Sequence, residues 1–488
     1  MSLQLYNTLS ARVEKFTASM DNTVRMYSCG PTVYDYGHIG NFRTFVAVDI
    51  LRRFLRQSGF KLNHVMNITD VDDKIIRNAA QQQKSISVYT KKYEEAFLED
   101  MDTLGLEHPE RVVRATDHIH KMAEFIHSLV DKGFAYRTED GSYYFRIGKF
   151  PEYGKLSKKD FGGIEIGARV DVDEYEKDNA RDFALWKSPK DGEESWETPI
   201  GKGRPGWHIE CSVMSMEYLG PSFDLHAGGE DLIFPHHENE IAQSEALTGQ
   251  IFSRFWMHVR FLLVEGEKMS KSAGNFFTLR DLLLKGHKPS SIRYLLSSVP
   301  YRKQLNFTFD GLKQAAHSVD RLRTFKSRLE RAQLAPGKNE SIHALAEKTK
   351  AEMRSALEDD LNTARALAAI FDMVRDVNIA ADKNDLRQDD KAPLMDALCR
   401  FDEIFPVMND DDGEKMARAL EWAKAHGLSA ANADAPEISD EEVERLIAAR
   451  VAAKKARDFA QADGLRAQLS EAGILVEDTK DGMRWKRK

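Results

Sequence analysis

The stretch that most constrains the fold is residues 24–69. Over its first six residues Val24, Met26 and Ser28 alternate with Arg25, Tyr27 and Cys29, as in a strand, and Gly30-Pro31 ends that run. An apolar segment with helical spacing follows over 42–55, and residues 61–69 have the composition of a second strand. A strand, a helix and a strand in this order predict a βαβ unit, which has parallel strands and a right-handed crossover.

Two chemically versatile side chains fall at the ends of these elements. Cys29 closes the first predicted strand and His38 precedes the helix. Ligands of parallel sheets bind at the carboxyl ends of the strands, near helix N-termini. A cysteine at a strand end is more often a small buried hydrophobe, however, and a histidine before a helix is more often a packing or surface residue. The two residues alone favour a structural role.

The composition limits the class of protein. A chain of 488 residues is too long for one typical domain. No run of about 18 apolar residues predicts a membrane helix, and the first residues lack the pattern of a signal peptide. Three cysteines argue for a reducing cytoplasm rather than a disulfide framework. With a net charge of −8, any nucleic acid must bind at a local basic patch.

The pattern along the chain predicts several domains. Residues 84–135 are expected to be helical, and a capping box at Ser439 opens a helix through about Leu469, followed by a hairpin. We predict four segments: an α/β domain with a parallel sheet (1–308, with an inserted region of short strands and loops at about 120–200), an antiparallel helical bundle (309–405), a linker (406–437) and a small C-terminal module (438–488).

One candidate metal site combines residues from distant parts of the chain. His236 and Glu240 are four residues apart in a segment predicted to be helical from Pro235, so they share a face. An imidazole and a carboxylate at that spacing can chelate a metal, although most such pairs are surface pairs. Together with the thiols of Cys29 and Cys211 they would form a four-ligand set suited to zinc. The separations are wide, so only the fold could assemble such a site.

A second candidate site is the lysine loop, residues 267–275. It contains Lys268, Ser270, Lys271 and Ser272, and it follows an apolar strand predicted over 261–264. Two mobile cations, two hydroxyls and turn backbone N–H groups can hold a triphosphate. A bare pair of lysines is more often a solvated basic turn, so this loop alone decides nothing.

Several segments of the sequence resemble those of a known family. His38-Ile-Gly-Asn41 and Lys268-Met-Ser-Lys271-Ser272 are similar to the two signatures of class I aminoacyl-tRNA synthetases. The stretches 29–35, 67–74, 206–211 and 234–243 resemble the cysteinyl-tRNA synthetases in particular, and the resemblance covers essentially the whole chain. The first signature usually ends in a second histidine. Asn41 stands there instead, and it can donate a hydrogen bond but cannot carry charge.

The resemblance implies a function. A cysteinyl-tRNA synthetase of this kind has a Rossmann-like catalytic domain, acts as a monomer, and uses ATP with Mg²⁺ to convert L-cysteine to cysteinyl-adenylate, which it transfers to tRNA(Cys). One zinc per chain would select the substrate thiolate over serine, which an apolar pocket separates poorly. The site residues it implies are His38, Asn41, Lys268 and Lys271 for catalysis; His38, Gly40, Gly229, Asp231 and Lys271 for ATP; Thr69 and Trp207 for cysteine; Cys29, Cys211, His236 and Glu240 for zinc; and Arg457 and Trp485 for tRNA.

Several alternatives stay open at this point. Asp231 is equally suited to capping a helix, and Trp207 to packing in the core. The zinc could serve only to hold the fold together. A ligase of thiol biosynthesis that joins cysteine to a sugar amine would share the activation chemistry but would need no tRNA-reading end. A catalytically silent zinc-containing RNA-binding protein is a further alternative, and the intact lysine loop argues against it.

Overall fold

The structure is a computed structural model that describes residues 3–159, 182–190, 192–427, 440–455, 458–471, 474–479 and 482–487. The chain divides into two compact units. The first comprises Met1–Leu283 and His287–Ala419, and the second comprises Leu284–Gly286 and Leu420–Lys488. Each unit is described by itself below.

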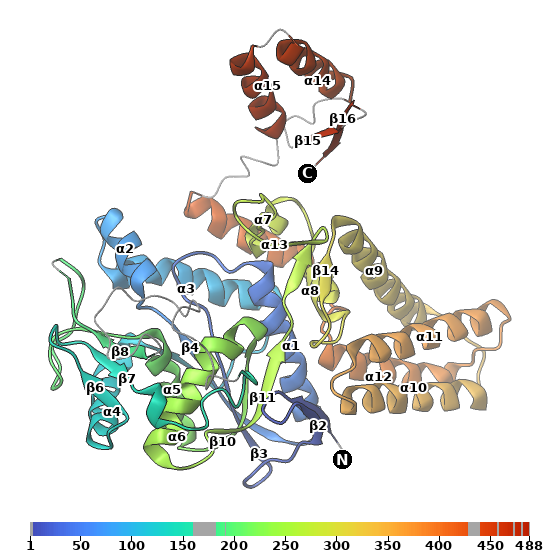
Figure 1. The fold of residues 1–488 in the computed structure, drawn as a ribbon. Helices are drawn as coiled ribbons and strands as arrows, with labels where there is room; N and C mark the ends of the chain where they lie inside the picture. Colours follow the sequence, from blue (N-terminus) through green and yellow to red (C-terminus); the bar gives the residue numbers. More distant parts are fainter. Residues whose placement is uncertain are drawn as a thin grey trace. The chain divides into compact units, whose positions relative to one another are not determined.

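A five-stranded sheet lies at the centre of the first unit (Figure 1), and all its strand pairs are parallel. In spatial order the strands are β11 (Ser253–Val259), β10 (Phe223–Gly229), β3 (Thr23–Ser28), β4 (Lys61–Ile68) and β5 (Arg111–Arg114). A parallel sheet is covered by helices on both faces, so most residues of its central strands are buried, as in β3 and β10. The predicted βαβ unit is confirmed as β3, α1 (Ile39–Gln57) and β4.

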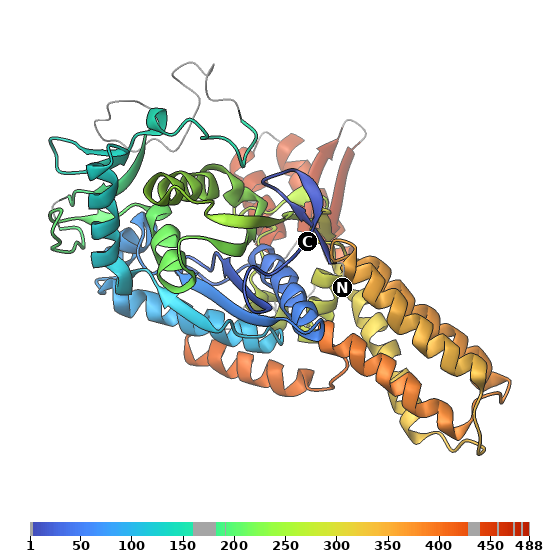
Figure 2. The ribbon, with the colours of Figure 1, turned by 90° about the horizontal axis from the view of Figure 1, so that it is seen from below.

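Helices cover both faces of this sheet (Figure 2). Helices α1 and α3 (Ile86–Thr103) lie on one side, and α5 (Trp207–Leu219) and α6 (Glu238–Thr248) lie on the other. The ring of Phe97 in α3 lies 5.0 Å from that of Phe45 in α1, so α3 packs on α1. Two further helices, α2 (Asp73–Gln81) and α4 (Ile119–Asp131), follow β4 and β5 in the chain.

The prediction of a helix over 84–135 is wrong in its middle. Gly105, with φ of +64°, follows the end of α3, and the segment Arg111–Arg114 forms β5. Valines favour strands because their branched side chains fit a pleated surface, and Val113 is buried. The segment extends the parallel sheet at β4, which is a contact that local periodicity does not reveal.

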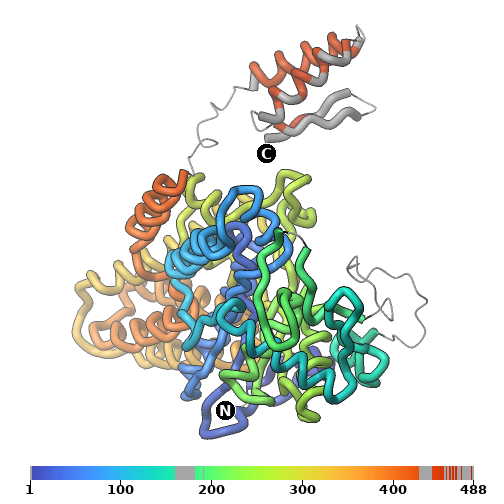
Figure 3. The backbone as a smooth tube through the Cα atoms, turned by 90° about the vertical axis from the view of Figure 1, so that its left-hand side faces the viewer, coloured from blue at the N-terminus to red at the C-terminus, as the bar shows by residue number. Residues whose placement is uncertain are grey.

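The inserted region is confirmed as a small antiparallel sheet. Its strands are β6 (Ala135–Arg137), β7 (Tyr143–Phe145), β8 (Phe183–Lys187) and β9 (Arg204–Pro205). The rings of Phe145 and Phe183 stack at 5.0 Å between centroids. In Figure 1 and Figure 3 this region lies on one side of the central sheet and the helical bundle lies on the other.

Two smaller sheets complete the α/β part. A hairpin is formed by β1 (Gln4–Asn7) and β2 (Arg12–Lys15). Strands β12 (Leu262–Val264), β13 (Glu267–Lys268) and β14 (Leu305–Phe307) form a sheet that supports the lysine loop, and two short helices lie between β13 and β14, namely α7 (Leu279–Leu284) and α8 (Pro289–Ser297).

The helical bundle predicted over 309–405 is confirmed. The helices are α9 (Phe309–Arg331), α10 (Glu340–Glu358), α11 (Thr363–Asp382) and α12 (Lys391–Ile404), and α13 (Asp412–Ala425) follows them. Buried side chains at three- and four-residue spacing line the interior, including Leu322, Phe325, Met373 and Phe401. None of the helices in the described ranges has both the length and the apolar character needed to cross a membrane.

The second unit ends in two helices and a hairpin. The single helix predicted through Leu469 is instead α14 (Asp440–Lys455) and α15 (Phe459–Glu471), followed by the predicted hairpin of β15 (Ile474–Thr479) and β16 (Gly482–Arg487). The carboxylate of Asp458 accepts a hydrogen bond from the backbone N–H of Gln461 at 3.0 Å, so it caps α15 and separates the helices. Val443, Leu446, Leu469 and Ile474 form the core of this unit.

Candidate active site and metal centre

The carboxyl ends of the central strands bring the candidate residues to one edge of the sheet. Cys29 follows β3, Thr69 follows β4 and Gly229 ends β10. The backbone N–H of Cys29 donates to the carbonyl of Ala227 at 3.2 Å, which continues the pairing of β3 with β10 past the end of β3. Such an edge is where parallel sheets bind ligands.

The four predicted metal ligands meet at this edge. One ligand atom from each of Cys29, Cys211, His236 and Glu240 lies within 4.8 Å of those of the other three. The two sulfur atoms are 3.9 Å apart, and His236 Nε2 lies 3.1 Å from Glu240 Oε1. All four side chains are buried. Cys29 follows β3, Cys211 lies in α5, His236 lies in the turn before α6 and Glu240 lies in the first turn of α6.

The backbone before His236 differs from the predicted helix. Pro235 was expected in the first turn of the helix, but Phe234 has φ of −141° and ψ of 130°, and α6 begins only at Glu238. His236 therefore lies in a short turn of wider helix just before α6. The contact across four residues, from His236 to Glu240, survives because the turn continues directly into the helix.

The electrostatics of this group favour a cation. Burial opposes ionisation of Cys211, but the hydrogen bond from Cys29 and the charge of His236 lower its pKa to about 6. Burial opposes the charge on His236 as well, yet Cys211 and Glu240 raise its pKa to about 10. The Glu240 pKa falls to about 2 despite burial, because His226 and His236 stabilise its charge. A buried thiolate and carboxylate thus share one proton on His236, which a metal ion can displace.

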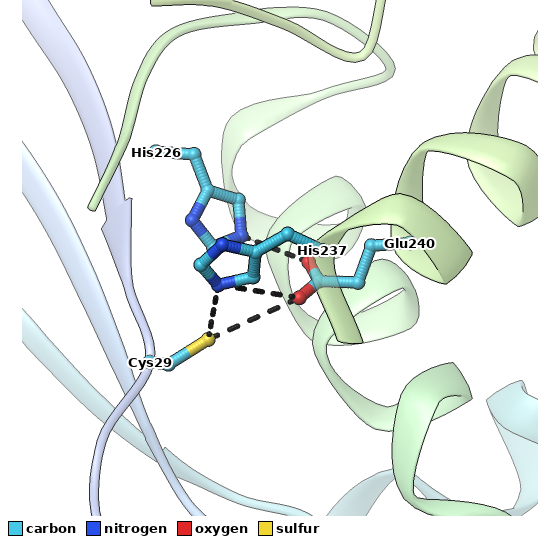
Figure 4. A group of neighbouring side chains, drawn as sticks. All are labelled: Cys29, His226, His237 and Glu240. Atoms are coloured by element: carbon cyan, nitrogen blue, oxygen red, sulfur yellow. Dashed lines mark hydrogen bonds and ion pairs between the residues drawn. The ribbon is translucent and has the colours of Figure 1, made fainter. Parts of the chain in front are cut away.

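A second ligand group shares two of these residues. Figure 4 shows Cys29, His226, His237 and Glu240, whose ligand atoms also lie within 4.8 Å of one another. His237 Nε2 is 3.3 Å from the Cys29 sulfur, and His226 Nε2 is 2.8 Å from Glu240 Oε2. His237 Nδ1 lies 2.8 Å from Nε2 of His258. The group that contains His236 supplies two thiols and therefore suits zinc better. His226 contacts Glu240 and His237 contacts Cys29, so these two histidines hold the two shared side chains in place.

The two predicted cysteine-binding residues border this metal group. The hydroxyl of Thr69 donates to Glu210 Oε2 at 3.0 Å, and Glu210 precedes Cys211 in α5. The indole of Trp207 stacks on the His236 ring with centroids 4.3 Å apart. Trp207 keeps 38% of its surface exposed, which is more than a core aromatic would show. Thr69 and Trp207 therefore both lie next to the candidate metal ligands.

His38 and Asn41 cap the N-terminus of α1 through two reciprocal hydrogen bonds. The backbone N–H of Asn41 donates to His38 Nδ1 at 3.2 Å, and the backbone N–H of His38 donates to Asn41 Oδ1 at 3.1 Å. This is a capping box in which histidine replaces the usual hydroxyl residue. Burial lowers the His38 pKa to about 4, so the ring is neutral at pH 7. Its Nδ1 accepts a bond, so the proton lies on Nε2, where it can be donated.

The two signature segments are joined by their backbones. The N–H of Ile39 donates to the carbonyl of Phe277 at 3.0 Å, and the His38 ring meets the edge of Phe276 at 5.1 Å. Lys271 Nζ lies 2.5 Å from Asp35 Oδ2, three residues before His38. Lys268 lies in β13 and is exposed. The lysine loop is therefore held next to the N-terminus of α1.

Gly229 and Asp231 lie side by side at the end of β10. A Cβ at position 229 would come within 2.4 Å of Asp231 Oδ1, so only glycine fits there without a shift. The suggestion that Asp231 caps a helix is wrong, because no side-chain cap starts the 3₁₀ turn Glu230–Leu232 or α6. The Asp231 carboxylate is exposed, and no hydrogen bond joins it to the described residues.

The two residues predicted to bind tRNA belong to the second unit. Arg457 lies outside the described residues. Trp485 lies in β16, opposite Val476 of β15, and its partly buried ring packs against the core of that unit.

Sequence reasoning missed the histidines and the acid around the metal group. His226, His237 and His258 follow no spacing rule, because they come from two strands and a turn. Burial raises the pKa of Glu210 well above its usual value, and its Oε1 has no hydrogen-bond partner in the described part of the chain. The only sequence signal for them was their place in apolar strands and in a helix, where charged and ionisable side chains are rare.

Family models match most of the chain. A model described as the tRNA synthetases class I (C) catalytic domain matches residues 15–317. A DALR domain model matches residues 352–408, and a model of the cysteinyl-tRNA ligase anticodon binding domain matches residues 436–485.

Proteins with known names are similar over the full length. A cysteine–tRNA ligase of Koribacter versatilis is 66% identical over 495 residues, and one of Solibacter usitatus is 58% identical over 488 residues; both alignments cover 100% of each chain. Among solved structures, Mycobacterium tuberculosis methionyl-tRNA synthetase in complex with methionyl-adenylate matches with a TM-score of 0.59 and 17% identity. That match covers 81% of this chain and 93% of the other, and it supports the fold alone.

Proposed function

This chain belongs to the cysteinyl-tRNA synthetase family of class I aminoacyl-tRNA synthetases, and on that premise we propose that it joins L-cysteine to tRNA(Cys). ATP activates the cysteine carboxylate to cysteinyl-adenylate with release of pyrophosphate, and the 3′ terminal adenosine of tRNA then accepts the cysteinyl group. The protein is a cysteine–tRNA ligase, and we place it in the cytoplasm as a monomer.

The observation that carries the proposal is the meeting of four metal ligands beside the predicted cysteine site. Cys29, Cys211, His236 and Glu240 are far apart in the chain, and their ligand atoms lie within 4.8 Å of one another. A buried group of two thiols, an imidazole and a carboxylate has the donor chemistry and the number of ligands that zinc prefers. Trp207 stacks on one of these ligands.

The donor atoms of these residues suit zinc, and a zinc ion held here would have a role in substrate selection. Zinc held by Cys29, Cys211, His236 and Glu240 would bind the substrate thiol as a thiolate and so separate cysteine from serine, whose neutral hydroxyl is a poor ligand. Thr69 and Trp207 would form the walls around the substrate side chain. A contribution of the metal to the stability of the fold is compatible with this role.

The phosphates of ATP would bind where the two signature segments meet. His38 is neutral and would donate a hydrogen bond from Nε2 to a phosphate oxygen. Lys271 would leave Asp35 and follow the charge on the leaving pyrophosphate, with Lys268 giving weaker support. Asn41 would contribute through the cap that orients His38 rather than through charge. Gly40 would let the chain come close to the phosphates.

The adenosine of ATP would lie at the carboxyl end of β10. Gly229 leaves space at the end of β10, and the exposed Asp231 carboxylate can accept hydrogen bonds from the ribose hydroxyls. This arrangement follows the general rule for open α/β sheets, in which nucleotides bind at the carboxyl ends of the strands.

The thiol-biosynthesis ligase is the weaker alternative. It would need no anticodon-reading segment, whereas residues 436–485 match an anticodon binding domain model and the named relatives are similar over their full length. Arg457 and Trp485 are our candidates for tRNA contacts in that segment, since an aromatic ring and cations together suit unpaired bases.

Two linked assays test the proposed function. Cysteine-dependent exchange between ATP and pyrophosphate, measured with each amino acid in turn, should be strong for cysteine alone. Charging of purified tRNA(Cys) with labelled cysteine should then follow. Exchange with cysteine but no charging of any tRNA would replace this proposal by the thiol-biosynthesis alternative, and exchange with another amino acid would contradict both.

A further inference from the structure

A buried arginine joins the segment after the lysine loop to helix α3. Arg280 lies in the first turn of α7, and only 2% of its surface is exposed. Its Nη2 atom lies 3.1 Å from the carbonyl oxygen of Ala96, 3.0 Å from Oε2 of Glu99 and 3.0 Å from Oδ1 of Asp100. Three oxygen atoms of one helix thus contact one nitrogen, and these contacts fix the start of α7 on α3.

The same guanidinium group also reaches the chain that leads to His38. Its central carbon lies 5.8 Å from the centre of the Tyr36 ring, and that ring meets the edge of the Tyr93 ring of α3 at 5.1 Å between centroids. A cation over the face of an aromatic ring is attracted to it. Since Tyr36 is two residues before His38, Arg280 contacts both α3 and the chain just before the first signature segment.

The lysine loop keeps its shape through hydrogen bonds of its own. Asn275 closes its base, because its Oδ1 accepts from the backbone N–H of Ser270 at 2.8 Å and its Nδ2 donates to the carbonyl of Lys268 at 3.2 Å. Residues 271–274, at the tip of the loop, are exposed. Since ATP binding would take Lys271 away from its present ion pair, the position of the tip would then depend on the two segments attached to the base.

Two segments attach the base of the loop to the fold. One is β13, a strand of two residues that pairs with β12. The other is residues 276–279, where the backbone N–H of Leu279 donates to the carbonyl of Gly37 at 3.3 Å. Arg280 comes directly after this second segment. Its contacts with α3 therefore decide where that end of the loop lies.

We propose that Arg280 is a positioning residue for adenylate formation, which sets the place from which Lys271 reaches the leaving pyrophosphate. Arg280 is buried against α3 and acts through the loop rather than on a substrate. A guanidinium offers its donors in a fixed planar fork, whereas lysine offers one compact group on a flexible stem. The substitution Arg280→Lys therefore keeps the charge but loosens the attachment. The inference rests on the proposed function, because the role of Lys271 belongs to it.

The test is a double-mutant cycle in which Arg280→Lys and Lys271→Ala are made singly and together. For each protein we would measure kcat for cysteine-dependent pyrophosphate exchange, KM for cysteine and the urea midpoint of unfolding. Glu99→Ala is a milder second variant, because it removes one of the three oxygen contacts and leaves the arginine in place. Arg293→Lys is the matched control, because Arg293 is equally buried and its Nη1 donates to the carbonyl of Leu104 at 3.0 Å. It lies in α8, which α7 separates from the loop in the chain.

We expect Arg280→Lys to lower kcat on the order of tenfold, since a misplaced group can slow a reaction by up to about 100-fold and β13 still holds the other end of the loop. KM for cysteine should not change. Once Lys271 is alanine, Arg280→Lys should slow exchange no further, because the two residues act as one unit. Glu99→Ala should show the same pattern with a smaller loss, and Arg293→Lys should lower the urea midpoint but leave kcat unchanged.

Three results would overturn the role of Arg280. They are an unchanged kcat in Arg280→Lys, losses that multiply in the double variant, and an equal loss of kcat in Arg293→Lys. If Arg280→Lys does not fold, Glu99→Ala decides by the same criteria. A wild-type protein without cysteine-dependent exchange would instead refute the proposed function itself.

Discussion

Substitution of Gly40 by alanine should separate activity from stability. A Cβ at position 40 would lie 2.9 Å from both Cε1 and Nδ1 of His38 and 3.3 Å from the terminal carbon of Met269. Ordinary carbon contacts need about 3.5 Å or more, so the ring must retreat by roughly 0.6 Å. That movement breaks the bond from the Asn41 N–H to Nδ1, now 3.2 Å long, and takes the Nε2 donor away from its present position.

The expected magnitudes differ for the two properties. Loss of the cap costs about 1 kcal/mol of stability. Gly40 is the second residue of α1, so alanine recovers only part of the roughly 1 kcal/mol by which it exceeds glycine in a helix interior, and the net loss stays below about 1 kcal/mol. A displaced phosphate contact can slow a reaction on the order of 100-fold. Gly40→Ala should therefore unfold near the wild-type temperature but slow cysteine-dependent pyrophosphate exchange by about that factor.

Gly148→Ala is the matched control, because nothing lies within 4 Å of a Cβ at position 148; it should leave exchange and unfolding unchanged. The reasoning fails if Gly40→Ala exchanges at the wild-type rate, since His38 would then not need its present position. It fails equally if the variant loses activity only because it unfolds.

Three further predictions address the phosphate site and the C-terminal module. Lys271→Ala should slow adenylate formation without weakening cysteine binding, because a cation that meets developing charge acts on the rate; equal loss of cysteine affinity would argue against it. Burial lowers the His38 pKa from its ordinary 6.5 to about 4, so stability from this group is present above pH 6.5 and is lost as the pH falls toward 4. His38→Asn keeps a good cap and should flatten the pH dependence of the urea midpoint in that window; an unchanged slope would count against the shift. Ending the chain at Ala435 should leave pyrophosphate exchange nearly intact. It should sharply reduce tRNA charging and make tRNA binding depend less on salt. Undiminished charging would show that the C-terminal module does not read tRNA.

The residues of the site that lie at the ends of strands could be predicted from the sequence. Cys29 and Thr69 come directly after predicted strands, and parallel strands end at the same edge of a sheet. The chemistry of their side chains also suggests Cys211, His236 and Glu240 as partners of Cys29, although only the fold could bring them together, and it does. Cys29 and Thr69 lie at that edge because a βαβ unit leaves little freedom in where strand ends lie.

Other parts depend on tertiary contacts that no local pattern encodes. Strand β5 is too short to show a period and is defined by its pairing with β4. His226 and His237 became neighbours of Glu240 through the turn before α6. Asp458 caps the start of α15, inside a segment whose composition suits one continuous helix.

The central claim is that a metal held by Cys29, Cys211, His236 and Glu240 selects cysteine. The most direct measurement is the ratio of kcat/KM for cysteine and serine in pyrophosphate exchange, taken on protein of known zinc content before and after chelation. With about one zinc per chain, we predict that cysteine is favoured on the order of 10⁴-fold or more, and that chelation reduces both the cysteine rate and the ratio until zinc is restored. A metal-free protein that still prefers cysteine by the same ratio would contradict the account.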